Sequence, residues 1–297
     1  MFTTEERRNY IGGSDISAVM GMNRWKTQLK LWLEKTGDAE LADLSQNEAV
    51  QLGTELEEFV AQKFAKITGK SVRKQSKMYV HKEYPYMVAH VDRLITGTDE
   101  LLECKTCGSY KKDEWEGDEI PQEYILQVNW YLGITGRKRG YIAVLIGGQQ
   151  FKYKVIDFDV ELFSIMVDMA KDFWNCVKTN TPPAITPSDN ELILKIFPNH
   201  TEDFIQNQEI EDRVDYLQQI KSDITALKEE QQMLEAELKN IINTHIGILT
   251  DKYKITWKEQ TSSKLNVDRL KADELYDKYA DKVATRVLRI SKIKQAA

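Results

Sequence analysis

Two apolar segments that carry charged residues constrain the fold of this chain more than any other feature. Residues 87–92 are Met-Val-Ala-His-Val-Asp and residues 101–105 are Leu-Leu-Glu-Cys-Lys. Both segments are typical of β-strands, and the Thr-Gly-Thr-Asp sequence between them is typical of a turn. Because side chains alternate along a strand, Glu103 and Lys105 should point the same way, and Asp92 would lie across from them in a hairpin.

Two carboxylates and an ammonium group on one apolar hairpin are costly to bury unless they have a function. Asp92 and Glu103 could hold Mg²⁺ or Mn²⁺ through their oxygens, and the Lys105 ammonium could stabilise developing negative charge. The alternative is a surface hairpin whose charged residues face water. The first interpretation predicts a metal-dependent phosphodiesterase.

The composition fits one large domain, or one domain with an appendage. Of the 297 residues, 41% are hydrophobic and 30% are charged, and the net charge is −6. A negative net charge does not exclude a nuclease, because a local basic groove and bound metal ions can hold DNA. A cytoplasmic location is expected, since the sequence shows no disulfide framework, no membrane-spanning apolar run and no signal-peptide region.

The order of apolar patterns predicts an α/β (α+β) core of nuclease size. The predicted elements are two short helices within 14–36, a helix at 45–68, strands at 71–81, 86–95 and 100–106, a helix at 120–135, strands at 139–147 and 150–157, and a helix at 159–178. We expect two helices to bury apolar stripes. The stripe of helix 45–68 is Leu52, Leu56, Phe59, Val60, Phe64 and Ile67. The stripe of helix 159–178 is Leu162, Ile165, Met166, Met169, Phe173 and Val177.

Beyond a Pro-rich boundary, residues 208–243 are predicted to form one long helix with an apolar repeat near 3.5 residues. The repeat consists of Ile210, Val214, Leu217, Ile220, Ile224, Leu227, Leu234, Leu238 and Ile241. This helix could form a coiled-coil hairpin, an oligomer seam, or a face that packs locally on a small domain. A strand at 253–257, a helix at 267–279 and a strand at 284–292 are predicted after it.

Further polar residues could complete a site. Glu57 lies off the apolar stripe of its helix and could supply a third carboxylate, unless it sits on a solvated face. Gln127 lies at the edge of a buried face and could orient water or a phosphate oxygen, unless it is an ordinary boundary residue. Arg7, with Gly-Gly-Ser14 at a helix start, forms a candidate anion pocket. Lys111-Lys112 and residues 137–139 are candidate phosphate contacts, or solvated loops.

Together these motifs resemble the YqaJ viral recombinase family, the λ exonuclease branch of the PD-(D/E)XK nucleases. The resemblance covers about residues 5–178 and rests on several short segments in the family's order. They are Arg7 with Ile-Gly-Gly-Ser-Asp at 11–15, Gly-Thr-Glu-Leu-Glu at 53–57, Val-Asp-Arg-Leu at 91–94, Leu-Glu-Cys-Lys at 102–105 and Gln-Val-Asn-Trp at 127–130. It implies a restriction-endonuclease-like core with a central mixed sheet flanked by helices. The domain is predicted to span 1–180, followed by a linker at 181–207 and a C-terminal region at 208–297.

The resemblance also implies an activity. It implies a 5′→3′ exonuclease that uses two Mg²⁺ ions, for which Mn²⁺ can substitute, and degrades one strand of linear duplex DNA. A ring-like homo-oligomer, with a trimer favoured, and a single-strand annealing protein are the implied partners in phage-type recombination. An endonuclease on the same fold and a non-catalytic DNA-binding module are the alternatives.

The roles of single residues follow from the same resemblance. Asp92 and Glu103 are implied metal ligands, Lys105 positions the attacking water or the phosphate, and Glu57 and Gln127 fall on supporting catalytic positions. Glu57 is expected as a third metal ligand from its place on the helix. Arg7 and Ser14 are implied to hold the 5′-phosphate of DNA. The chain has His90-Val-Asp where the λ enzyme has Ser-Pro-Asp, so His90 replaces a phosphate-binding serine. A protonated imidazole could take over that contact.

Overall fold

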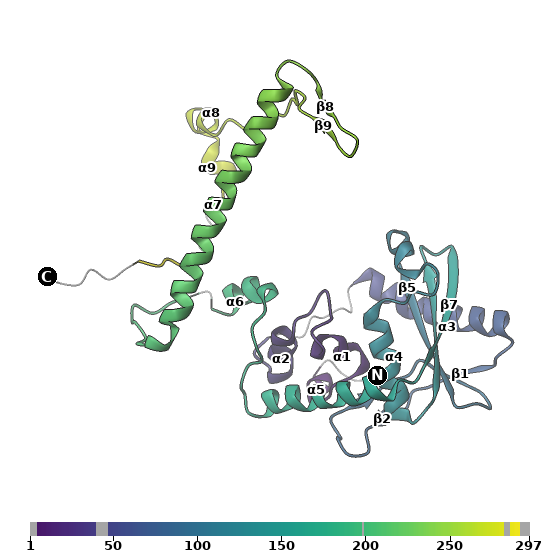
Figure 1. The fold of residues 1–297 in the computed structure, drawn as a ribbon. Helices are drawn as coiled ribbons and strands as arrows, with labels where there is room; N and C mark the ends of the chain where they lie inside the picture. The colour runs from purple at the N-terminus through teal and green to yellow at the C-terminus, as the bar shows by residue number, and fades with distance from the viewer. Residues whose placement is uncertain (1–4, 40–46, 198, 282–285, 292–297) are drawn as a thin grey trace. The chain divides into compact units, whose positions relative to one another are not determined.

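The computed structural model describes residues 5–39, 47–197, 199–281 and 286–291. The chain forms two compact units, Met1–Ile196 and Phe197–Ala297, each of which has its own internal contacts. The first unit contains the hairpin and every candidate site residue, and the second contains the long helix (Figure 1).

A five-stranded mixed sheet forms the centre of the first unit, in the order β1-β4-β5-β6-β7. The strands are β1 (Val72–Lys74), β4 (Arg93–Ile95), β5 (Glu100–Cys107), β6 (Arg139–Ile146) and β7 (Gln150–Asp157). Only the β5–β6 pair is parallel, and the other neighbours are antiparallel. A separate two-stranded sheet joins β2 (Tyr79–Val80) to β3 (Val88–Ala89).

Helices cover both faces of this sheet, so the predicted fold class is confirmed. One face packs against α3 (Glu48–Thr68), through a cluster that contains Val60, Phe64 and Leu102. The larger cluster on the other face includes α1 (Gly13–Val19), α2 (Gln28–Thr36), α4 (Gln122–Thr135) and α5 (Val160–Lys178). The first unit also contains α6 (Asn190–Ile196) and the 3₁₀ turns Glu6–Asn9, Ser109–Trp115 and Pro187–Asp189.

Local sequence signals explain where these elements begin and end. The Asn47 side chain accepts hydrogen bonds from the amides of residues 49 and 50 and caps α3, whose predicted start at 45–46 lies outside the described residues. Gly69 ends α3 in the left-handed conformation at φ 72°, where glycine carries no Cβ penalty. Gly147 and Gly148 have positive φ and make the tight turn from β6 to β7.

The predicted buried stripes are only partly correct. On α3, Val60 and Phe64 are fully buried, but Leu52, Phe59 and Ile67 are each about half exposed, at 47%, 51% and 50%. On α5, Ile165 is 53% exposed. Periodicity gives the direction of a side chain, whereas burial also requires a neighbour, and no described element covers the outer side of either helix at these positions.

The predicted strands 71–81 and 86–95 are wrong as continuous elements. The first divides into β1 and β2, and the second into β3 and β4, and the parts belong to two different sheets. The chain leaves the ladder at His90–Asp92, where the Asp92 side chain accepts a hydrogen bond from the Cys104 amide at 2.8 Å. A side-chain acceptor therefore replaces a backbone partner at this point.

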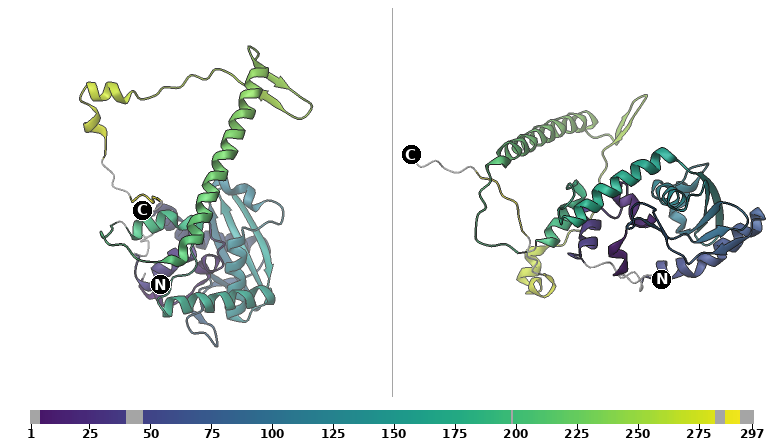
Figure 2. Two further views of the ribbon diagram at one scale, coloured as in Figure 1. Left: turned by 60° about the vertical axis from the view of Figure 1, so that its left-hand side comes forward. Right: turned by 90° about the horizontal axis from the view of Figure 1, so that it is seen from below.

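The second unit contains α7 (Glu211–Ile242), preceded by the 3₁₀ turn Gln208–Ile210. Figure 2 shows α7 as one continuous helix in both views. It is followed by the strand pair β8 (Gly247–Leu249) and β9 (Lys254–Thr256) and by the short helices α8 (Val267–Ala272) and α9 (Tyr276–Tyr279).

Two C-terminal predictions need correction. The predicted helix at 267–279 is interrupted near Glu274, which has a φ of 56° that a continuous α-helix does not allow. The predicted strand at 284–292 is wrong for residues 286–291, which form no strand, and its other positions lie outside the described residues. Within the described ranges, no helix is both long and apolar enough to cross a membrane.

Candidate active site

The β4–β5 hairpin places the two carboxylates next to each other. Arg93 pairs with Leu102 and residue 94 with residue 101, so Asp92 extends the ladder opposite Glu103. The hydrogen bond from the Cys104 amide fixes the Asp92 carboxylate at this position. The predicted hairpin is therefore present, and the two charges lie at the end of one short antiparallel pair.

The electrostatics of this pair are unfavourable without a cation. Burial, followed by the charge of Glu103, raises the pKa of Asp92 well above its ordinary value of 3.8. Glu103 has only 3% of its side chain exposed, and its Oε2 accepts no hydrogen bond from the described residues. A buried carboxylate oxygen without a partner is costly, and two buried carboxylates side by side are a typical environment for a hard cation.

Lys105 and Gln127 surround the other oxygen of Glu103. Lys105 Nζ lies 2.7 Å from Glu103 Oε1, and Gln127 Nε2 donates to the same oxygen at 2.9 Å. Burial would lower the pKa of Lys105, but the charges of Glu103 and Asp92 outweigh burial and raise it. The structure thus brings together four predicted site residues and leaves Glu103 Oε2 available for a ligand.

The third predicted carboxylate has another partner. Glu57 projects from α3 and forms an ion pair with Arg93, whose side chain is 2% exposed and also bonds Glu58 at 2.9 Å. The charge of Glu57 still contributes to the raised pKa of Asp92. Over the part of the chain that the structure describes, no group of three or more metal-ligating side chains is present. The donor set that fits a divalent cation is thus Asp92 with Glu103.

The predicted anion pocket lies where the 3₁₀ turn Glu6–Asn9 leads into the first turn of α1. Arg7 Nη2 donates to Ser14 Oγ at 3.2 Å, so these two residues are in contact. Partial burial lowers the pKa of His90, and the positive charge of Arg7 acts in the same direction, as expected for neighbouring groups. Arg7 and Ser14 are therefore in direct contact, and His90, two residues before Asp92, lies within reach of the Arg7 charge.

A buried lysine that sequence analysis missed holds this loop. Lys35 Nζ donates to the carbonyl oxygens of Arg7 at 2.7 Å and Tyr10 at 2.5 Å, and to Asp15 Oδ2 at 2.8 Å. Asp15 in turn accepts from the Gly12 amide at 3.2 Å. The residue before α1 is thus Gly12, and Asp15 acts from inside the first turn rather than as the cap. The only sequence signal is that Lys35 follows Leu31 by four residues and Trp32 by three, a spacing that puts it on the apolar face of the helix.

A close backbone approach connects the loop to the carboxylates. The Tyr131 ring packs so closely on Gly13 that a Cβ at Gly13 would lie 2.3 Å from Tyr131 Cε1. Gln127 Nε2 donates to the Tyr131 hydroxyl at 2.8 Å as well as to Glu103. Glycine is therefore required at Gly13, because any side chain there would displace the tyrosine.

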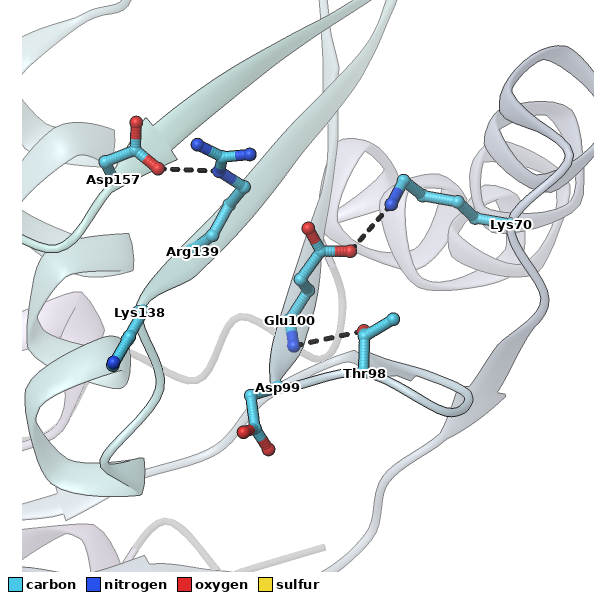
Figure 3. A pocket seen from close by; sticks show the side chains of 7 residues that line it. All are labelled: Lys70, Thr98, Asp99, Glu100, Lys138, Arg139 and Asp157. Carbon is cyan, nitrogen blue, oxygen red and sulfur yellow. Dashed lines mark hydrogen bonds and ion pairs between the residues drawn. The ribbon is translucent and has the colours of Figure 1, made fainter.

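The predicted basic patches differ in their surroundings. Arg139 pairs with Asp157 at 2.6 Å in a shallow pocket at the opposite end of β5 from Lys105 (Figure 3). The pocket is lined by Lys70, Thr98, Asp99, Glu100, Lys138, Arg139 and Asp157. Acidic and basic groups alternate in it, so it has no clear preference for phosphate. Lys111 instead lies over the Trp25 ring, at 4.5 Å from its centroid.

Comparisons with known proteins identify the family of this chain. A family model for the YqaJ-like viral recombinase domain matches residues 4–138. The uncharacterized protein YqaJ of Bacillus subtilis (strain 168) is 38% identical over 284 residues, which cover 92% of this chain and 88% of that protein.

Two solved structures share the fold. The alkaline exonuclease LHK-Exo from Laribacter hongkongensis has a TM-score of 0.51 at 20% identity and covers 59% of this chain and 91% of its own. LHK-Exo in complex with dAMP has a TM-score of 0.50 at 22% identity and covers 60% of this chain and 92% of its own.

Proposed function

The chain belongs to the YqaJ-like viral recombinase domain family, as its motifs predicted, and from this premise we propose that it is a DNA exonuclease. The observation that carries the proposal is the buried pair of Asp92 and Glu103 with Lys105 at 2.7 Å from Glu103. Its fold neighbour LHK-Exo is an alkaline exonuclease, which supports the same activity. The substrate is linear double-stranded DNA, of which one strand is degraded in the 5′→3′ direction during phage-type recombination.

Asp92 and Glu103 would hold the catalytic metal, for which Mg²⁺ is the expected ion and Mn²⁺ a substitute. When bound, two such ions supply charge stabilisation for the attacking and leaving oxygens of an in-line displacement. Lys105 keeps its proton because of the neighbouring carboxylates, so its charge favours a hydroxide-like attacking water. Gln127 orients Glu103 through one hydrogen bond, and Glu57 supports the site from its ion pair with Arg93.

Arg7, Ser14 and His90 would bind the 5′-phosphate at the end of the degraded strand. The contact between Arg7 and Ser14 and the guanidinium charge of Arg7 support this role, since phosphate is recognised by charge-assisted hydrogen bonds. The partners expected from the family are the DNA end, a single-strand annealing protein and further copies of the chain in a ring, with a trimer favoured. The place of action is the cytoplasm of a bacterial host.

The decisive experiment is digestion of duplexes labelled at either end, with and without a 5′-phosphate. We expect Mg²⁺-dependent release of nucleotides from the 5′ end, loss of release in EDTA, and no cleavage of closed circular duplex. Glu103→Ala should abolish release, whereas Glu100→Ala, at the far end of the same strand and paired with Lys70, should retain it. Cleavage of circles would indicate an endonuclease. Duplex binding without release by the wild-type protein would indicate a non-catalytic module.

A further inference from the structure

The long helix α7 presents an apolar stripe that no described residue of its own unit covers. Six of its apolar side chains have exposed fractions between 36% and 66%, which is unusual for residues of this size. They are Ile220, Ile224, Leu227, Leu234, Leu238 and Ile241. A continuous apolar stripe on one face of a helix is typical of a surface that binds another helix.

The stripe follows a strict heptad repeat. From Leu217 onward, apolar or amide side chains alternate at intervals of three and four residues as far as Ile241. The a positions are Leu217, Ile224, Gln231 and Leu238, and the d positions are Ile220, Leu227, Leu234 and Ile241. A repeat of seven residues keeps such a stripe facing a partner helix only when the two helices supercoil around each other.

The described residues of the second unit offer no partner for α7. In the described part of the second unit, the other helices, α8 and α9, have six and four residues, whereas α7 has 32. A coiled-coil hairpin, which needs two helices of similar length, is therefore wrong for this region. The partner that matches α7 in length and repeat is a second copy of α7.

The single polar core position favours one orientation. In a parallel, in-register pair, Gln231 meets Gln231 of the other copy, so the two amides can hydrogen-bond to each other. In the antiparallel arrangement that overlaps the whole stripe, each Gln231 faces Leu227 and loses that partner. Because an unsatisfied amide in an apolar seam is costly, the parallel arrangement is preferred.

The flanking charges point the same way. In the parallel arrangement, Asp223 at a g position faces Lys228 at an e position of the other copy, and this attraction occurs twice. In the same arrangement, Glu230 at a g position faces Glu235 at an e position of the other copy, and this repulsion also occurs twice. In the antiparallel arrangement, Lys221 attracts Glu235 of the other copy twice. However, Lys228 faces Lys228 of the other copy and Glu230 faces Glu230, and both contacts are repulsive. Asp223 also meets Glu237 twice there, so like-charge contacts outnumber attractions.

We propose that α7 is a self-association element that joins copies of this chain through a parallel, in-register coiled coil with Gln231 in its seam. The element lies in the second unit and includes no residue of the candidate active site, so self-association would be a property additional to the proposed nuclease activity. Its effect would be to tether nuclease units to one another by their C-terminal regions.

The test is disulfide formation in the full-length protein. Gln231→Cys places thiols opposite each other in the parallel seam, whereas Ser222→Cys lies on the outer face of the same helix. Under mild oxidation, we expect Gln231→Cys to form cross-linked dimers at least about tenfold faster than Ser222→Cys, because seam thiols have a high effective concentration. The wild-type protein, with its three native cysteines, gives the background rate.

Two further measurements complete the test. Leu227→Glu with Leu234→Glu in the Gln231→Cys background should abolish the fast cross-link while circular dichroism shows that the first unit remains folded. Equal rates for the two cysteine variants would overturn the proposal. Faster coupling in a mixture of Gln231→Cys and Leu227→Cys than in Gln231→Cys alone would indicate the antiparallel arrangement and would overturn it as well.

Discussion

Lys35→Met tests how the loop before α1 is held in place. The Lys35 side chain is 2% exposed and the Asp15 carboxylate 8%, and they form an ion pair at 2.8 Å. The same ammonium donates to two backbone carbonyl oxygens of the loop, at Arg7 and Tyr10. Methionine keeps most of the side-chain volume but removes all three hydrogen bonds, so the perturbation is mainly electrostatic.

The expected cost follows from this burial. Removing one partner of a buried ion pair leaves an uncompensated charge and typically costs about 3–5 kcal/mol. For a unit of the size of Met1–Ile196, about 1 kcal/mol shifts Tm by roughly 2–4 °C. We therefore expect Lys35→Met to lower the Tm of the first unit by roughly 6–20 °C at neutral pH.

The pH dependence of this effect has a defined sign. Burial would raise the pKa of Asp15, but the Lys35 ammonium outweighs burial and holds the pKa below its ordinary value of 3.8. A group whose pKa is lower in the folded state stabilises the protein above the unfolded pKa and loses this effect as the pH falls. The contribution of Asp15 should thus be complete above pH 3.8 and disappear in stronger acid.

Thermal unfolding followed by circular dichroism measures this cost, and Lys30→Met, an exposed lysine on the same helix, is the matched control. The double variant Asp15→Asn with Lys35→Met should be less destabilised than the two single variants combined, because the residues share one interaction. Below its Tm, Lys35→Met should also digest 5′-phosphorylated and unphosphorylated ends at similar rates. A Tm within about 2 °C of the wild-type value corresponds to a loss of stability of less than about 1 kcal/mol. This result would refute the predicted role of Lys35 in holding the loop.

Three further substitutions probe the surroundings of the site. Gly13→Ala would place a methyl group 2.3 Å from the Tyr131 ring and should cost about 1–3 kcal/mol in guanidinium unfolding, with slower digestion. Arg93→Met should cost roughly 3 kcal/mol in the same assay, because it removes charge-assisted hydrogen bonds of about 1.5–3 kcal/mol each, including that to Glu57. His90→Ala should reduce the ratio of digestion rates for phosphorylated over unphosphorylated ends with little change in Tm, since the side chain is only partly buried.

Sequence patterns predicted those parts of the fold that depend on neighbours along the chain. Gly69, Gly147 and Gly148 mark a helix end and a tight turn by conformations that other residues avoid, and the structure has both features there. The hairpin with Asp92 and Glu103 was predictable for the same reason, because strand alternation and turn chemistry act over a few residues.

Features that depend on distant partners were not predictable in this way. Lys35 lies 20 residues from Asp15, and nothing in the sequence around either residue indicates that the other is its partner. Phe59 shares its helical stripe with Phe64, yet 51% of Phe59 is exposed while Phe64 is buried, because only Phe64 belongs to the cluster that packs on the sheet. The place of Glu57 off the apolar stripe of its helix indicated a functional carboxylate, whereas its ion pair with Arg93 depends on the register of β4 and could not be read from the helix.

The contacts between the loop and the carboxylates bear on how an exonuclease would locate its cut. Gly13 packs against Tyr131, Tyr131 accepts a hydrogen bond from Gln127, and Gln127 donates to Glu103. Tyr131 and Gln127 are one turn apart on α4, so a single rigid helix separates the two ends of this path. In a nuclease that binds a 5′-phosphate beside Ser14 and hydrolyses a phosphodiester bond beside Glu103, α4 would fix the distance between the 5′ end of the strand and the hydrolysed bond. Gly13→Ala should then alter the length of the released product as well as the rate, whereas a substitution that acts only on stability would alter the rate alone.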